Sequence, residues 1–239
     1  MTAKGFADSG GAQIHYTVCG AGFPLVLLHG NSEESRYFDR QIPFFAANYT
    51  VVAIDSRAHG LSTRGNRPLN FQTMAADVLA VLDRLSIAQA IILGFSDGGN
   101  TALHVAIMAP ERVRALVLVG ANLSPKGMTR RAYAQVLAGY IGYRAGGLVS
   151  SRARAAAERW ALMVFHPKLT PCDLAPLRLP TLVIAGEHDM IRPSHTRLIA
   201  AAIDRATLQI IPHADHFVAG KMPDIFNRTV EAFLQSIER

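Results

Sequence analysis

Short, strongly apolar runs alternate along the chain with segments in which apolar residues recur at helical spacing. The runs are rich in Val, Ile and Leu, which is typical of parallel strands covered on both faces of a sheet. They occupy residues 24–30, 50–56, 90–96, 113–121, 180–187 and 206–212. Helical spacing occurs in residues 35–47, 71–85, 99–108, 195–203 and 223–237. This alternation predicts an α/β fold with a doubly wound, mostly parallel sheet and right-handed crossovers.

Two segments depart from this alternation. Residues 12–18 (AQIHYTV) alternate apolar and polar positions, which predicts an antiparallel hairpin at one edge of the sheet. Residues 122–176 contain Ala- and Arg-rich helical stretches but no convincing strand. An excursion of this length is more often functional than idle, so we expect a helical cap over an active site. The predicted organisation is one domain, with residues 1–121 and 177–239 as the core and 122–176 as the inserted cap.

Composition fits this globular interpretation, because half of the 239 residues are hydrophobic and 18% are charged. The formal charge of +6 is unevenly placed. Residues 123–172 hold eight basic residues and one acid, whereas the remainder holds 16 basic and 17 acidic residues. Since the excess lies in the cap, we expect neither a nucleic-acid nor a membrane partner.

Other features narrow the class of protein further. The first residues lack the basic and apolar pattern of a signal peptide, and no apolar run is long enough for a transmembrane helix, so we expect a cytoplasmic protein. The two cysteines form no disulfide framework or zinc motif, and nucleotide-binding glycine motifs are absent from the sequence. We therefore expect no cofactor and no metal. The oligomeric state stays open.

The most informative motif is G-x-S-x-G at residues 94–98, between a predicted strand and a predicted helix. A serine on so sharp a turn takes a strained backbone that lifts its hydroxyl above the sheet, and glycines on either side leave room for it. A lone match occurs by chance as a plain glycine-rich turn, but the flanking strand and helix favour Ser96 as a nucleophile. A serine hydroxyl also needs a neighbouring base, so the chain must supply a histidine.

Of the nine histidines, His213 and His216 follow the last apolar run, at the carboxyl edge of the sheet where catalytic groups of such folds gather. His216 is the preferred base. An imidazole base needs a carboxylate to fix its tautomer, and Asp189 follows the preceding strand at the same edge. The order Ser96, Asp189, His216 is the order of an α/β-hydrolase triad. Backbone amides of Asn31 and Asp97 are the expected oxyanion donors.

Five segments occur in a fixed order along the chain: HGN (29–31), DSRAHGLS (55–62), GFSDGG (94–99), GEHDMI (186–191) and HADHF (213–217). Together they resemble the signature blocks of the α/β-hydrolase superfamily. The resemblance implies a sheet of about eight strands, the triad Ser96, Asp189 and His216, and oxyanion amides at Asn31 and Asp97. It also implies that the 55–62 block mainly holds a loop. The GFSDGG turn and the VGAN segment (119–122) are similar to biphenyl-hydrolase-like enzymes, which act on amino-acid esters.

These inferences predict a serine hydrolase that cleaves a carboxylic ester or related acyl bond of a small molecule through an acyl-enzyme. Lactone, thioester and carbon–carbon bond hydrolysis, perhydrolysis and a low-turnover small-molecule receptor stay open as alternatives. Charge gives two conflicting indications of substrate preference. Asp97 would attract a cationic ester if its carboxylate faced the pocket, or would simply complement its helix N-terminus. The basic cap points instead to anions, or is only a solvated face.

Overall fold

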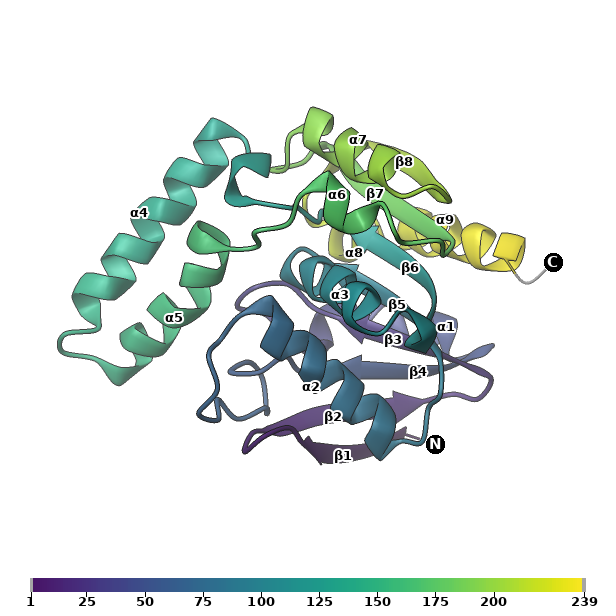
Figure 1. Ribbon diagram of the computed structural model, residues 1–239, viewed down its shortest axis with the longest axis horizontal. Coiled ribbons are helices and arrows are strands. Elements are labelled where there is room, and N and C mark those ends of the chain that lie inside the picture. Colours follow the sequence, from purple (N-terminus) through teal and green to yellow (C-terminus); the bar gives the residue numbers. More distant parts are fainter. Residues whose placement is uncertain (1, 238–239) are drawn as a thin grey trace.

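The computed structural model describes residues 2–237 as an eight-stranded sheet with helices on both faces and a helical hairpin projecting from one side (Figure 1). The strands are β1 (Thr2–Asp8), β2 (Gln13–Cys19), β3 (Phe23–Leu28), β4 (Tyr49–Ile54), β5 (Ala90–Phe95), β6 (Val113–Val119), β7 (Thr181–His188) and β8 (Ala206–Asp215). Their order across the sheet is β1-β2-β4-β3-β5-β6-β7-β8. β1–β2 and β2–β4 pair antiparallel and the other pairs are parallel, which confirms both the edge hairpin and the mostly parallel sheet.

The longer helices are α2 (Phe71–Arg84), α3 (Asp97–Met108), α4 (Arg130–Gly146), α5 (Ser151–Phe165), α7 (Pro193–Ala202) and α9 (Pro223–Ile237). Four-residue helices are α1 (Ile42–Phe45), α6 (Pro171–Leu174) and α8 (Val218–Lys221), and 3₁₀ turns are η1 (Ser35–Phe38), η2 (Pro110–Arg112) and η3 (Pro125–Gly127). No helix within residues 2–237 has the length and apolarity needed to cross a membrane.

The sheet separates two hydrophobic clusters. One packs α2, α3 and α7 against one face, and the other packs α1, α8 and α9 against the opposite face. Neighbouring residues of β5 illustrate the division, because Ile92 belongs to the first cluster and Ile91 and Leu93 to the second. Strands buried on both faces need apolar residues at every position, which explains the continuous apolar runs in the sequence.

The predicted helix at residues 35–47 is wrong as a continuous element. The segment instead forms η1, a turn and α1. Pro43 lies inside the predicted helix, where it removes a backbone donor and clashes with the preceding turn, so it starts a new helix instead. The Ser35 amide donates to Asp55 Oδ1 at 2.8 Å, which holds the first part of the segment to the sheet.

Residues 122–176 contain η3, α4, α5 and α6. Helices α4 and α5 pack on each other and extend away from the sheet, on the left of Figure 1. The two ends of the excursion belong to the core, since Leu123 and Leu174 are buried in the cluster that also contains α3 and α7. The division into core and cap at residues 122 and 176 stays a prediction.

Candidate active site

The backbone of Ser96 has φ 53° and ψ −116°, in the positive-φ region that side chains rarely adopt. It sits between the end of β5 and the first residue of α3, and its amide donates to Val119 O at 2.8 Å. A Cβ at Gly98 would lie 2.0 Å from Leu28 O, and one at Gly94 would lie 2.2 Å from Gly98 O. Only glycines fit at both positions, so the local sequence fixes the turn that presents Ser96.

The structure brings His216 and Asp189 to Ser96. His216 Nε2 is 3.1 Å from Ser96 Oγ, and His216 Nδ1 is 2.7 Å from Asp189 Oδ1. With Nδ1–H donating to the carboxylate, Nε2 is left as an acceptor for the serine hydroxyl. Both His216 and Asp189 are buried, whereas Ser96 is half-buried. His213, the other candidate base, is exposed beside Glu187 and does not contact Ser96.

The Asp189 carboxylate is held by its own loop. Its Oδ1 also accepts from the Ile191 amide at 2.8 Å, while its buried Oδ2 has no hydrogen-bond partner among the described residues. Gly120 lies against the pair, because a Cβ there would be 2.7 Å from the His216 ring. The Phe95 ring, 4.9 Å from the imidazole between centroids, packs on the same histidine. These contacts fix the orientation of the imidazole.

Asn31 and Asp97, the two predicted oxyanion donors, lie next to each other in the structure. Within residues 2–237 neither backbone amide donates to another protein group, so both are available to an oxyanion. Their side chains contact each other, with Asn31 Nδ2 donating to Asp97 Oδ2 at 2.8 Å. The same Nδ2 donates to Arg159 O in α5, also at 2.8 Å. Asn31 therefore joins the serine turn to the cap.

The Asp97 carboxylate is fully buried. Burial raises its pKa to about 6, although the hydrogen bond from Asn31 and the nearby His216 act in the opposite direction. The contact with Asn31 gives this carboxylate a positioning role in the loop. Its predicted binding of substrate stays a prediction.

Glu33 and Tyr37 form part of the site's surroundings and were not anticipated from the sequence. Glu33 Oε2 accepts from the Gly30 amide at 3.1 Å, and burial raises the Glu33 pKa to about 7. The Tyr37 ring stacks on Phe95 at 4.5 Å, and burial raises the pKa of its hydroxyl. An acid two residues after Asn31 in HGNSEES carries no special pattern, so no sequence signal distinguished it from Glu34.

The 55–62 block holds loops together. Asp55 accepts from the amides of Ser35 and Leu61 and contacts His15 Nδ1 at 2.9 Å. Arg57 is completely buried and pairs with Asp77. His59 differs from these two residues. Its buried Nε2 has no partner among the described residues, and burial lowers its pKa to about 3.

Two cavities flank these groups. One of about 340 Å³ adjoins His216 and is walled by the start of α4, including Thr129 and Gln135. The other, of about 430 Å³, lies beside Ser32 and Glu33, and Arg159 of α5 forms part of its wall. The cap therefore contributes a wall to each cavity. No group of His, Cys, Asp and Glu side chains within residues 2–237 is arranged to hold a metal ion.

A family model for the alpha/beta hydrolase fold matches residues 24–161, and the chain belongs to this family. The protein is therefore a hydrolase of the α/β-hydrolase fold. It is similar to 3-oxoadipate enol-lactonase 2 of Acinetobacter baylyi, with 29% identity over 93% of each chain. It is also similar to serine hydrolase BPHL of Mus musculus, with 29% identity over 94% of this chain and 84% of that protein. Among solved structures, Est816, described as an N-acyl homoserine lactone degrading enzyme, has a TM-score of 0.80 and 28% identity, covering 95% of this chain and 99% of Est816.

Proposed function

We propose that this protein cleaves a carboxylic ester of a small molecule through an acyl-enzyme on Ser96. The observation that carries the proposal is the pair of short contacts through one imidazole, 3.1 Å to Ser96 Oγ and 2.7 Å to Asp189 Oδ1. A hydroxyl in this setting can lose its proton to Nε2 while the carboxylate stabilises the imidazolium. No other histidine of the described residues lies within hydrogen-bond distance of Ser96 Oγ.

In the proposed reaction Ser96 Oγ attacks the ester carbonyl as its proton passes to His216. The amides of Asn31 and Asp97 then donate to the oxyanion of the tetrahedral intermediate. Collapse expels the alcohol, which takes its proton from His216, and leaves the acyl group on Ser96. Water activated by the same imidazole attacks the acyl-enzyme and releases the carboxylic acid. Ser96 is half-buried, and its partner His216 lines a cavity of about 340 Å³, which supports access by a small substrate.

The test is hydrolysis of a panel of p-nitrophenyl esters by the wild type and by Ser96→Ala. The variant is expected to lose on the order of 10⁴-fold or more in kcat/KM, because removing a serine nucleophile leaves only binding and the oxyanion donors. Ser236→Ala is the matched control, since that exposed hydroxyl lies near the end of α9 and, among residues 2–237, donates to Phe233 O. Equal activity of Ser96→Ala and wild type would refute the proposal. Tight binding of an ester without turnover would instead favour a receptor.

Lactone hydrolysis is the second candidate, and the similarity to an enol-lactonase and to an acyl-homoserine-lactone degrading enzyme favours it. A lactone is an internal ester, so the same groups suffice, but the alcohol stays attached to the acyl-enzyme until water attacks. Comparing kcat/KM for a lactone and for the open-chain ester of the same acid separates the two. A preference of about a hundredfold or more for the lactone, on the order of 3 kcal/mol, would assign the protein to lactones.

A further inference from the structure

A larger cavity, of about 870 Å³, lies at the base of the cap and has four cations among its lining residues. They are Lys126, Arg130, Lys168 and Arg192. All four are exposed, and within residues 2–237 none of them forms an ion pair with an acid. Four like charges around one cavity repel each other, so the site is left with an uncompensated positive potential.

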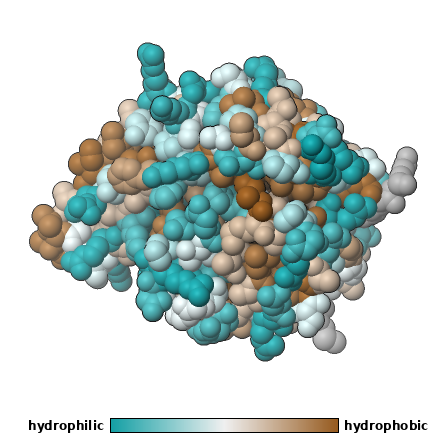
Figure 2. Space-filling view, viewed as in Figure 1, coloured by the Kyte–Doolittle hydropathy of each residue, from teal (hydrophilic) through white to brown (hydrophobic). Residues whose placement is uncertain are grey.

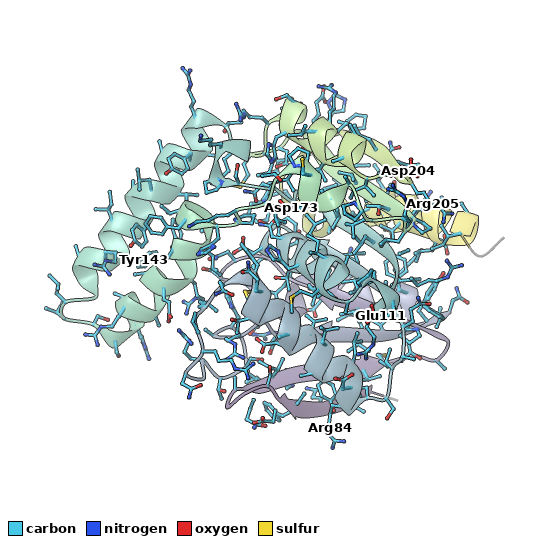
Figure 3. All side chains as sticks on the ribbon, viewed as in Figure 1. Arg84, Glu111, Tyr143, Asp173, Asp204 and Arg205 are labelled. Atoms are coloured by element: carbon cyan, nitrogen blue, oxygen red, sulfur yellow. The ribbon has the colours of Figure 1, made fainter. Side chains whose placement is uncertain are left out.

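Two helix ends add to that potential. Arg130 is the first residue of the 17-residue helix α4, and Arg192 is the residue before the 10-residue helix α7, so the positive ends of both helices meet at the cavity. One acid, Asp173, labelled in Figure 3, lies three residues after the lining residue Thr170. Its carboxylate accepts from the amide and hydroxyl of the lining residue Thr170, which ends the loop before α6. These two hydrogen bonds hold the Asp173 carboxylate to Thr170.

The interior of the cavity is apolar. Met128, Tyr133 and Val164 line it, and all three belong to the hydrophobic cluster that joins α4 to α5. Phe165 and Leu169 also line the cavity, on the segment by which the chain leaves the cap. A ligand in this cavity therefore meets apolar side chains inside and cations outside.

The cavity is distinct from the proposed reaction centre, since its lining includes none of the residues assigned to acyl transfer. A short β-bridge between Met128 and Ile191 closes its inner wall, together with a bond from the Arg192 amide to Gly127 O at 2.8 Å. Ile191 also donates its amide to Asp189, so the wall of the cavity continues directly into the Asp189 loop.

We propose that this cavity binds an organic anion in which one carboxylate is attached to an aliphatic chain or aromatic ring. Its volume lies in the range of small-molecule sites, and such sites combine an apolar lining with a few placed polar groups. A free inorganic anion would leave the apolar interior unfilled. A neutral ligand would gain nothing from the positive potential of the four cations.

The test is isothermal titration of the protein with octanoate, with octan-1-ol and with acetate. Octanoate is expected to bind more tightly than either, because only it satisfies both parts of the cavity. In Arg130→Gln/Lys168→Gln, octanoate affinity is expected to fall about tenfold or more, since charge-assisted contacts are lost, while octan-1-ol is little affected. The matched control is Arg152→Gln/Arg197→Gln, which removes the same charge from exposed positions outside the cavity and should leave octanoate affinity nearly unchanged.

The proposal would be overturned by an absence of octanoate binding to the wild type, by an equal loss in the control, or by full retention in the cavity variant. Far-ultraviolet circular dichroism checks folding, and a salt series on the wild type gives an independent measure, because screening should weaken octanoate and spare octan-1-ol. Loss of binding after a phosphonate has labelled Ser96 would place octanoate at the reaction centre instead. Binding is measured without turnover, so failure to hydrolyse esters would leave this result unaffected.

Discussion

The sheet and the α4–α5 hairpin are both regular structure, yet they bury their residues to very different degrees. Every residue of β5 is buried, whereas the 17 residues of α4 bury only Ala132 and Val136. Leu148 and Val149, in the turn between α4 and α5, are 84% and 92% exposed, and Figure 2 shows hydrophobic surface at that left end of the molecule. Burial on both faces determines the conformation of the strands. The hairpin is held mainly by one small cluster at its base.

This difference in burial implies a difference in rigidity between the two regions. Of the groups proposed to act on the substrate, Ser96 and Asp189 follow the largely buried strands β5 and β7, and His216, which follows the edge strand β8, is itself buried. The cap supplies walls to both flanking cavities but has few buried contacts of its own, and regions with few buried contacts open most readily. One cap contact is tight: Trp160 fills the space beside Gly139, where a Cβ would lie 2.0 Å from the indole, and the Tyr143 ring packs 5.3 Å from the same residue.

The largest expected difference in stability between the two regions comes from adding one methyl group to a glycine in each. Gly98→Ala is expected to destabilise the protein by about 3 kcal/mol, because the new Cβ would lie 2.0 Å from Leu28 O and backbone cannot easily move away. Gly142→Ala is expected to stabilise α4 by up to about 1 kcal/mol, since nothing lies within 4 Å of the added Cβ and alanine favours a helix.

Urea unfolding measured by circular dichroism gives the change at Gly98, and amide hydrogen exchange of α4 gives the change at Gly142. Similar effects of the two substitutions would contradict the contrast between a tightly packed core and a loosely packed cap. Loss of activity in Gly98→Ala without loss of stability would show that the turn relaxes around the methyl group.

The core was largely predictable from the sequence for the same reason that it is rigid. Strands buried on both faces are continuous apolar runs, and the predicted run at 90–96 corresponds to β5 at 90–95. The conformation of residues 35–47 was not predictable from the sequence. Its apolar spacing indicates one helix, but Pro43 interrupts that helix and a contact with Asp55 holds the first part of the segment. Tertiary contacts of this kind leave no local pattern.

The candidate site shows the same division. Ser96, Asp189 and His216 lie in motifs whose spacing and order could be recognised, and the structure brings them together. The bridge from Asn31 through Nδ2 to Asp97 and to Arg159 O could not be recognised, since it joins residues 66 and 128 positions apart. The environment of Glu33 likewise depends on burial by distant segments.

The buried Asp97 is expected to make the free energy of unfolding depend on pH, with an effect smaller than that of Gly98→Ala. Its pKa is about 6 in the folded protein, against an ordinary value of 3.8. Between about pH 4 and pH 6 the folded protein keeps a proton that the unfolded chain has released, so the free energy of unfolding falls as pH rises. Asp97→Asn is expected to remove the part of this fall that Asp97 causes, which amounts to about 2 kcal/mol at about 1.4 kcal/mol per pKa unit after allowance for local relaxation.

Urea unfolding at several pH values measures the effect. Glu33→Gln is the comparison, because the raised Glu33 pKa of about 7 extends its own slope above pH 6, where Asp97 no longer contributes. An unchanged slope between pH 4 and 6 in Asp97→Asn would mean that Asp97 is not the group responsible. The same variant tests substrate charge: an unchanged kcat/KM ratio between cationic and neutral esters would exclude Asp97 from binding the cation.

The smallest effect is expected at the second link between core and cap, the ion pair of Arg64 with Glu158 in α5. Arg64 Nε lies 2.8 Å from Glu158 Oε2, but both side chains are more than a third exposed to water. Exposed pairs contribute little because water and salt screen the charges, so Glu158→Gln should change stability by less than about 0.5 kcal/mol.

Asn31→Asp is the matched comparison at the partly buried link, where the new carboxylate can no longer donate to Arg159 O and repels Asp97. Measured by hydrogen exchange of α5 and by kcat/KM, Asn31→Asp should loosen the helix and slow turnover far more than Glu158→Gln. A larger effect at Glu158 would mean that surface charge, and not the contact through Asn31, holds α5 to the core.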